Sequence, residues 1–170
     1  IVFRTNAHVG VNISAKHLQD EFDAIVMTGG ASAPRDLPIP GRHFKGVHFA
    51  MEFLSQQNKR GAGDRIFSGE ILAGEKNVLV IGGGDTGSDC VGTSNRQGAK
   101  SVTQIELLAK PPVKRNDETN PWPLWPMILN TSSSHEEGVN REWAILTKEF
   151  LGDNNGRLTG LKIVDIKWGV

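Results

Sequence analysis

The feature that most constrains the fold is a short apolar run that ends in three glycines of fixed spacing. Residues 78–81 are wholly apolar, and Gly82, Gly84 and Gly87 follow in the pattern G-x-G-x-x-G. Such a run is typical of a strand buried on both faces of a parallel sheet, because helices cover that strand above and below. Residues 85–98 begin and end as a helix does, with Gly98 suited to the helix end. We therefore predict a strand, a tight turn and a helix, in that order.

Each glycine of this pattern has its own mechanical role. The first permits the tight turn, the second lets the backbone approach a pyrophosphate, and the third lets the helix pack closely on the strand. The free N–H groups and the dipole of the following helix favour negative charge. A dinucleotide site is thus predicted, with an ordinary glycine-rich turn as the alternative. The residues expected at the turn are Gly82, Gly83, Gly84, Asp85, Thr86 and Gly87.

The charges beyond the second apolar run bear on which dinucleotide binds. Glu106 lies about twenty residues past the last glycine, where an acidic side chain can bind ribose hydroxyls and would repel the 2′-phosphate of NADPH. Lys110, Lys114 and Arg115 follow it and are candidates for holding a phosphate, with a solvated basic loop as the alternative. We therefore expect NADH or NADPH as the cofactor, with NADH preferred.

Composition argues against several other classes of protein. Basic and acidic residues number 19 each and the basic ones are scattered, so neither nucleic acid nor an anionic membrane is expected as a partner. Cys90 is the single cysteine, which excludes an internal disulfide framework and a cysteine-held iron–sulfur cluster within one chain. We interpret it as a packing residue. No apolar stretch reaches the roughly twenty residues that span a bilayer, so a cytoplasmic setting is expected.

The remaining segments predict an α/β fold. A serine cap begins a short helix at Ser14, and residues 47–57 carry a helical apolar stripe. Strands are expected at residues 23–28, 65–67, 142–150 and 158–168, the last two joined by a hairpin turn at residues 153–156. The expected fold is a Rossmann-like, three-layer dinucleotide-binding domain with a parallel sheet and an antiparallel β-ribbon near the C-terminus.

Two further segments have more than one interpretation. Residues 110–126 are rich in proline and predict a long loop, with Trp122 and Trp125 at a domain interface or, as the alternative, stacked on a cofactor ring. His135, Glu136 and Glu137 are adjacent in a Ser/Gly-flanked stretch. Adjacent residues do not place their side chains on one helical face, so no metal site is predicted there.

Several stretches resemble the small (β) subunit of glutamate synthase. The similar stretches are residues 22–31, 34–41, 47–51, 80–87, 110–112 and 120–123. The resemblance covers nearly the whole chain. The Asn-Pro-Trp-Pro sequence of residues 120–123 is much more specific than the glycine pattern alone.

The resemblance implies a role in electron input. In that family an NAD(P)H-binding domain is inserted into an FAD-binding domain, and hydride passes from the nicotinamide to FAD. Electrons then pass through iron–sulfur clusters to FMN on the large (α) subunit, where 2-oxoglutarate and glutamine-derived ammonia become glutamate. The implied partners are this large subunit and the flavin domain of the same polypeptide. The similarity implies no residue that acts as an acid, a base or a nucleophile, as expected for hydride transfer between two cofactors.

A second glycine-rich segment also matches the family. Gly29, Gly30 and Ala31 correspond to a strand end that lies, in the family, near the interface between the two nucleotide domains. A plain turn at the end of a strand is the alternative interpretation.

The chain departs from the family plan by omission. It lacks a second G-x-G-x-x-G near its start, a set of cysteines and a C-terminal flavin-binding segment. We therefore expect residues 1–45 to be the edge of an FAD-binding domain with its connection, and residues 46–170 to be an NAD(P)H-binding domain truncated at its C-terminus. FAD and iron–sulfur clusters are expected only in the full-length protein, and the isolated fragment is expected to be inactive. The alternatives are the equivalent domain of a dihydropyrimidine dehydrogenase-like enzyme or bifurcating transhydrogenase, or a non-catalytic nucleotide-binding module.

Overall fold

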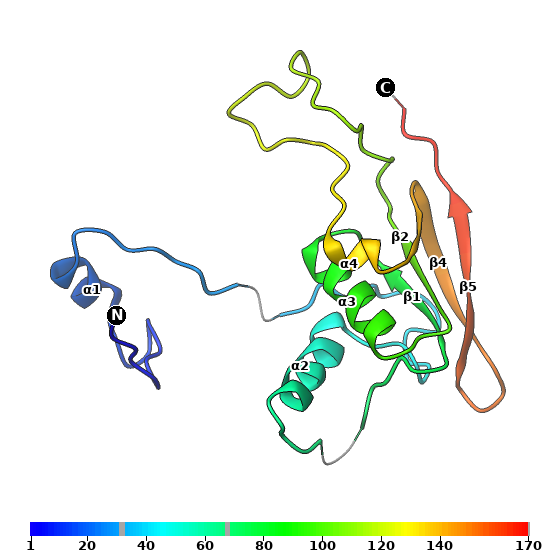
Figure 1. The fold of residues 1–170 in the computed structure, drawn as a ribbon, viewed down its shortest axis with the longest axis horizontal. Helices are drawn as coiled ribbons and strands as arrows, with labels where there is room; N and C mark the ends of the chain where they lie inside the picture. The colour runs from blue at the N-terminus through cyan, green and yellow to red at the C-terminus, as the bar shows by residue number, and fades with distance from the viewer. Residues whose placement is uncertain (31–32, 67–68, 170) are drawn as a thin grey trace. The chain divides into compact units, whose positions relative to one another are not determined.

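The chain forms two compact units, Ile1–Ala33 and Pro34–Val170. The computed structural model in Figure 1 describes residues 1–30, 33–66 and 69–169. The first unit contains helix α1 (Ala15–Glu21). The Ser14 side chain accepts a hydrogen bond from the His17 N–H at 3.0 Å, which confirms the predicted serine cap.

The predicted strand at residues 23–28 is wrong. These residues have no regular secondary structure, and Val26 and Met27 are 84% and 92% exposed. A buried strand requires neighbouring strands to bond its backbone and a layer to cover its side chains. Within the described part of the first unit, the β-type pairing is the isolated bridge between Val9 and Ile13. The apolar residues 23–28 therefore have no sheet to join in the described part of this unit.

The second unit is built on a three-stranded parallel sheet of order β1-β2-β3. Its strands are β1 (Asn77–Ile81), β2 (Ser101–Ile105) and β3 (Asn140–Glu142). Helix α3 (Asp85–Arg96) connects β1 to β2, and the register pairs Val80 with Gln104. The predicted order of strand, glycine turn, helix and strand is thus confirmed, and with it the Rossmann-like fold class.

Helices cover one face of this sheet. Helix α2 (Ala50–Gly61), helix α3 and the short α4 (Ser133–Glu136) lie on one side of the strands in Figure 1. The core between them consists of Phe53, Ala73, Val80, Cys90, Val91 and Val102. Helix α2 begins at Ala50 rather than near residue 47, because the Glu52 carboxylate accepts the Phe49 N–H at 3.2 Å and so caps the helix there. Cys90 is a buried packing residue, as predicted.

Strand β1 is not buried on both faces, contrary to the prediction. Val80 faces the helices and is buried, whereas Leu79 and Ile81 point to the opposite face and are 40% and 45% exposed. β1 is one of the two end strands of this sheet, and among the described residues the helices cover the face that Val80 shares with Val102. A continuous apolar run does not by itself show how many faces are covered.

The C-terminal part is the predicted antiparallel ribbon. Its strands are β4 (Ile145–Gly152) and β5 (Leu158–Asp165), and they lie on the side of the sheet away from the helices in Figure 1. The connecting turn is closed by a bond from the Gly156 N–H to the Asp153 carbonyl at 3.0 Å. Glu142, expected in the first ribbon strand, instead ends β3. Arg65 and Ile66 form no strand, and Phe67 lies outside the described residues.

No helix within the described ranges combines the length and hydropathy that crossing a bilayer requires.

Candidate functional site

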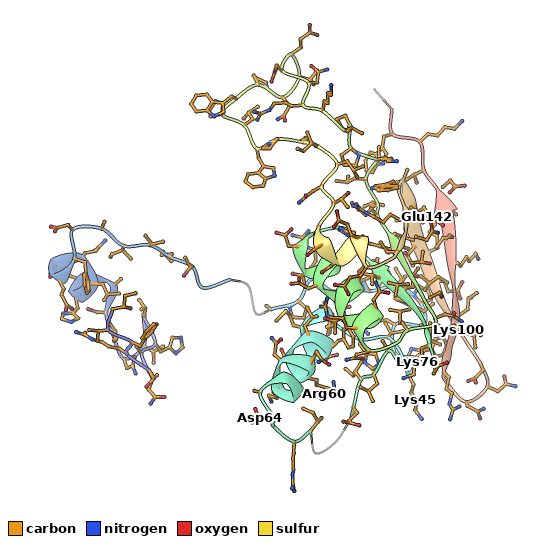
Figure 2. All side chains as sticks on the ribbon, viewed as in Figure 1. Lys45, Arg60, Asp64, Lys76, Lys100 and Glu142 are labelled. Carbon is orange, nitrogen blue, oxygen red and sulfur yellow. The ribbon has the colours of Figure 1, made fainter. Side chains whose placement is uncertain are left out.

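The predicted turn lies at the carboxyl edge of the parallel sheet. Gly82 follows β1, Glu106 follows β2, and Glu142 ends β3. Figure 2 shows Glu142 at one end of the strands, whereas Lys76 and Lys100, which precede β1 and β2, lie at the other end. Open α/β sheets bind their ligands at the carboxyl edge. The topology therefore places the glycine turn and Glu106 where such a ligand binds.

The glycine turn has the close packing that its pattern predicts. Gly82 has a φ of +114° and its N–H donates to the Ile105 carbonyl at 2.9 Å. A Cβ at Gly87 would lie 2.5 Å from the Gly82 carbonyl oxygen, so helix α3 approaches the end of β1 too closely for any side chain. A Cβ at Gly84 would meet no atom within 4 Å. The turn is therefore packed on its inner side and open at Gly84.

The start of α3 is suited to bind an anion. Gly84 is the N-cap, and the Ser88 N–H already donates to the Gly84 carbonyl at 3.0 Å. The preceding N–H groups of Asp85, Thr86 and Gly87 have no acceptor inside the helix, because every α-helix begins with such free donors. The Asp85 carboxylate lies in the same turn and reduces the positive potential. The Thr86 side chain helps to line a groove between α2 and α3.

Glu106 lies directly over the turn. Its carboxylate occupies the space into which a Cβ at Gly83 would project. Its backbone N–H donates to the Glu142 carbonyl at 2.9 Å, which fixes it at the end of the sheet. The structure thus brings Glu106 and the glycine turn together, as the spacing predicts.

The charge of Glu106 is paired, which the sequence analysis missed. Arg141 on β3 places Nη2 3.4 Å from Glu106 Oε1, and its Nη1 donates to the Asn130 carbonyl at 2.9 Å. The guanidinium also lies 5.1 Å from the ring centre of Trp143. An arginine two strands away from the turn has no sequence signal of its own, because only the parallel pairing of β2 and β3 brings it to Glu106.

The three predicted basic residues have different environments. Lys110 Nζ lies 4.8 Å from the ring centre of Trp143, on the same aromatic side chain that Arg141 contacts. Arg115 donates to the Leu124 carbonyl within its own loop. Lys114 is exposed. Of the three, only Lys110 contacts Trp143, the ring that Arg141 of the Glu106–Arg141 pair also contacts.

Residues 110–126 form the predicted loop, which is braced from within. The Asn120 amide donates to the Trp125 carbonyl at 3.0 Å and its oxygen accepts the Met127 N–H at 2.8 Å. Trp122 and Trp125 are both strongly exposed on this braced loop. Their predicted place at a domain interface stays a prediction.

The second glycine-rich segment belongs to the first unit. Gly29 and Gly30 are exposed, and a Cβ at either would meet no atom within 4 Å. Ala31 lies outside the described residues. The nucleotide-binding role of this segment stays a prediction.

A series of hydrogen-bonded polar groups connects the glycine turn to helices α4 and α3. Gln104 on β2 is 0% exposed; its Nε2 donates to the Gly82 carbonyl at 2.9 Å, and its Oε1 lies 3.0 Å from His135 Nε2. His135 Nδ1 accepts the Ser132 N–H at 3.0 Å, and the Ser132 hydroxyl is bonded to that of Ser88 on α3. Sequence reasoning considered His135 only as a metal ligand. The available signal was Gln104, an amide side chain two residues after Val102 and therefore on the same, buried face of β2.

The surroundings of His135 favour its neutral form. Burial is the largest cause that lowers the pKa of His135, and the nearby positive charge of Arg141 lowers it further. The negative charge of Glu106 acts in the opposite direction and is the smallest of the three causes. The imidazole of His135 therefore titrates below the usual range of histidine.

Comparison with known proteins gives one family match and several similar sequences. Residues 2–120 match the family described as pyridine nucleotide-disulphide oxidoreductase. The NADPH glutamate synthase small chain of Mycobacterium tuberculosis is 46% identical over 168 residues, which are 96% of this chain and 34% of that protein. The corresponding small chain of Bacillus subtilis is 40% identical over 175 residues, 98% of this chain and 35% of that protein.

A third similar sequence is much longer. The NADH glutamate synthase of Schizosaccharomyces pombe is 45% identical over 173 residues, 96% of this chain but only 8% of that protein. The chain therefore spans about a third of the bacterial small chains and less than a tenth of the yeast protein.

Proposed function

The chain belongs to the pyridine nucleotide-disulphide oxidoreductase family, and from that premise we propose that it is the NAD(P)H-binding, electron-input domain of a glutamate synthase small subunit. The observation that carries the proposal is the arrangement at the carboxyl edge of the sheet. There a glycine turn too tight for a side chain at Gly87 opens at Gly84, and the Glu106 carboxylate lies over Gly83. This combination is what a dinucleotide-binding turn requires.

The residues have separate roles in this proposal. The open backbone at Gly84 and the free N–H groups of Asp85, Thr86 and Gly87 hold the pyrophosphate. Glu106 accepts hydrogen bonds from ribose hydroxyls. When bound, the nicotinamide supplies the hydride, and the protein orients the cofactor and surrounds it with fixed charges. No acid, base or nucleophile from this chain is needed.

We propose NADH as the preferred cofactor. The Glu106 carboxylate beside the turn repels a 2′-phosphate, and the two terminal nitrogens of Arg141 are already directed at Glu106 and the Asn130 carbonyl rather than at a phosphate. The names of similar proteins include both NADPH and NADH enzymes, so similarity alone does not choose between the two.

The reaction of the whole protein follows from the same proposal. Hydride passes from the nicotinamide to FAD, and iron–sulfur clusters carry electrons to a large subunit that makes glutamate from 2-oxoglutarate and glutamine. The flavin domain of the same polypeptide and the large subunit are the proposed partners. Support comes from the 46% identity to a glutamate synthase small chain over 168 residues. Gly29 and Gly30 are proposed to lie near the flavin domain.

Calorimetric titration of the chain with NADH, and separately with NADPH, tests this proposal. Gly84→Val places its side chain on the open side of the turn, where the Cβ meets no atom within 4 Å, so the variant is expected to fold but to bind NADH at least about tenfold more weakly. Gly160→Val on β5 is the matched control, because a Cβ there also meets no atom within 4 Å. Failure of the unaltered chain to bind either nucleotide at millimolar concentration would contradict the proposal, as would equal binding by Gly84→Val.

A further inference from the structure

The carbonyl group of Gly82 is held by a side chain that does not face the cofactor site. Gln104 Nε2 donates to this carbonyl at 2.9 Å, from a side chain that is completely buried under the turn. A Cβ at Gly87 would lie 3.0 Å from the same Nε2 atom. The Gln104 amide therefore fills the gap between the end of β1 and the start of α3.

The polarity of the whole hydrogen-bond chain is fixed by two backbone groups. The Gly82 carbonyl can only accept, so the Gln104 NH₂ group must face it and the Gln104 Oε1 must face His135 Nε2. The Ser132 N–H can only donate, so His135 Nδ1 must be without a proton. Both conditions are met by a single form of His135, the neutral imidazole with its proton on Nε2.

The orientation of the Gly82 carbonyl decides where the next N–H points. In a trans peptide the C=O and N–H groups point in opposite directions. While Gln104 holds the Gly82 oxygen inward, the Gly83 N–H points away from Gln104. A peptide between two glycines has little steric resistance to rotation. If it rotated, an acceptor oxygen would replace a donor beside the expected position of the phosphates.

We propose that His135 is a positioning residue for the dinucleotide turn, whose neutral Nε2–H form orients the Gln104 amide and so keeps the Gly82–Gly83 peptide in its binding conformation. The inference rests on the proposed function, because it concerns the same turn. It adds a residue outside the glycine pattern, on α4, that sets cofactor affinity.

Charged groups on the neighbouring elements shift the pKa of His135. Arg141 on β3 opposes protonation and Glu106 after β2 favours it, while Arg96 on α3 is paired with Glu137 at the end of α4. A second proton would lie on Nδ1, opposite the Ser132 N–H, so the acceptor would be lost. The charged ring still donates from Nε2 to Gln104 Oε1, but its Nδ1–H now faces the Ser132 N–H, and this repulsion displaces the ring and, with it, the Gln104 amide that holds the Gly82 carbonyl.

The first test needs no substitution and no cofactor. In the isotope-labelled chain, long-range proton–nitrogen correlation spectra report the tautomer of His135, and amide spectra report Gly83. We expect the Nε2–H tautomer near pH 8, and we expect the Gly83 amide signal to shift with the same midpoint as His135 when the pH is lowered. An Nδ1–H tautomer, or a Gly83 amide shift that does not change as His135 titrates, would overturn the proposal.

The second test separates positioning from folding. His135→Gln keeps one donor and one acceptor, whereas His135→Leu removes both and serves as the disruptive variant. NADH affinity of the unaltered chain should fall about tenfold between pH 8 and pH 5.5, the equivalent of losing about one hydrogen bond. His135→Gln should bind at pH 8 like the unaltered chain and lose most of that pH dependence. Retention of the full pH dependence by a folded His135→Gln would overturn the proposal.

The two proposals fail in different ways. If the unaltered chain binds neither NADH nor NADPH but His135 and Gly83 still titrate together, the proposed function is wrong and the positioning of the turn stands. If NADH binds and the Gly83 amide signal does not change as His135 titrates, the proposed function stands and the positioning role is wrong.

Discussion

The Glu106 carboxylate and the Arg141 guanidinium lie 3.4 Å apart, with their side chains only 18% and 13% exposed. The two residues come from the ends of neighbouring parallel strands, and Glu106 also lies over Gly83 of the glycine turn. The acid proposed to bind the ribose is thus part of an ion pair rather than an isolated charge. Under the proposed function, cofactor choice and stability are both expected to depend on this pair.

Substitution of Glu106 should change the choice between NADH and NADPH. In Glu106→Gln the repulsion of a 2′-phosphate is removed, and the positive charge of Arg141, no longer balanced by a carboxylate, attracts the phosphate. We expect the ratio of the NADPH to the NADH dissociation constant to fall about tenfold, or ~1.4 kcal/mol. Calorimetry of both nucleotides measures this ratio, with Glu149→Gln in the exposed ribbon as the control. An unchanged ratio would show that Glu106 does not discriminate.

Removal of Arg141 should destabilise the chain more than removal of Glu106. Arg141→Met leaves a largely buried carboxylate without its partner, at an expected cost of about 3 kcal/mol in the free energy of unfolding. Glu106→Gln keeps an acceptor for the arginine and should cost about 1 kcal/mol. Urea unfolding of both variants and of the double variant measures the coupling. Strictly additive effects would mean that the two side chains do not interact.

Local sequence was sufficient to predict the turn and its elements. The apolar residues 78–81, the glycines and the spacing to Glu106 predicted β1, the tight turn, α3 and the place of Glu106 at the end of the second strand. The hairpin at residues 153–156 was also predicted, because its turn residues bond one another. These features depend on groups that are near in sequence, or on a motif whose geometry is fixed.

What sequence reasoning missed depends on tertiary contacts. Residues 23–28 have strand composition, but the described part of their unit provides no sheet for them. Arg141 reaches Glu106 only through the pairing of β3 with β2. His135 is linked to Gly82 through Gln104, which lies 31 positions earlier in the sequence. The periodicity of apolar residues in a helix or strand carries no information on contacts between residues that are distant in sequence.

Gly87 should be the least replaceable glycine of the turn. The added carbon of Gly87→Ala would lie 2.5 Å from the Gly82 carbonyl oxygen, a backbone atom that cannot move without displacing β1 or α3. We expect a loss of about 2 kcal/mol or more in the free energy of unfolding. Gly84→Ala is the matched control in the same turn, and it should cost less than about 1 kcal/mol because its Cβ meets no atom within 4 Å. Equal costs in thermal or urea unfolding would contradict the packing of α3 on β1.

Cys90 should be unreactive while the chain is folded. Burial raises the pKa of the Cys90 thiol to about 11, and the nearby charge of Asp89 acts in the same direction. The thiolate is the reactive form, so a disulfide reagent at pH 8 should label the folded chain at least about a hundredfold more slowly than the chain in urea. Because the folded pKa is raised, this thiol contributes stability at neutral pH that is lost as the pH rises toward 11. The labelling rate at increasing urea concentration gives the free energy of opening at α3. Rapid labelling without denaturant would show that α3 opens readily and that the core between α2 and α3 is not closed.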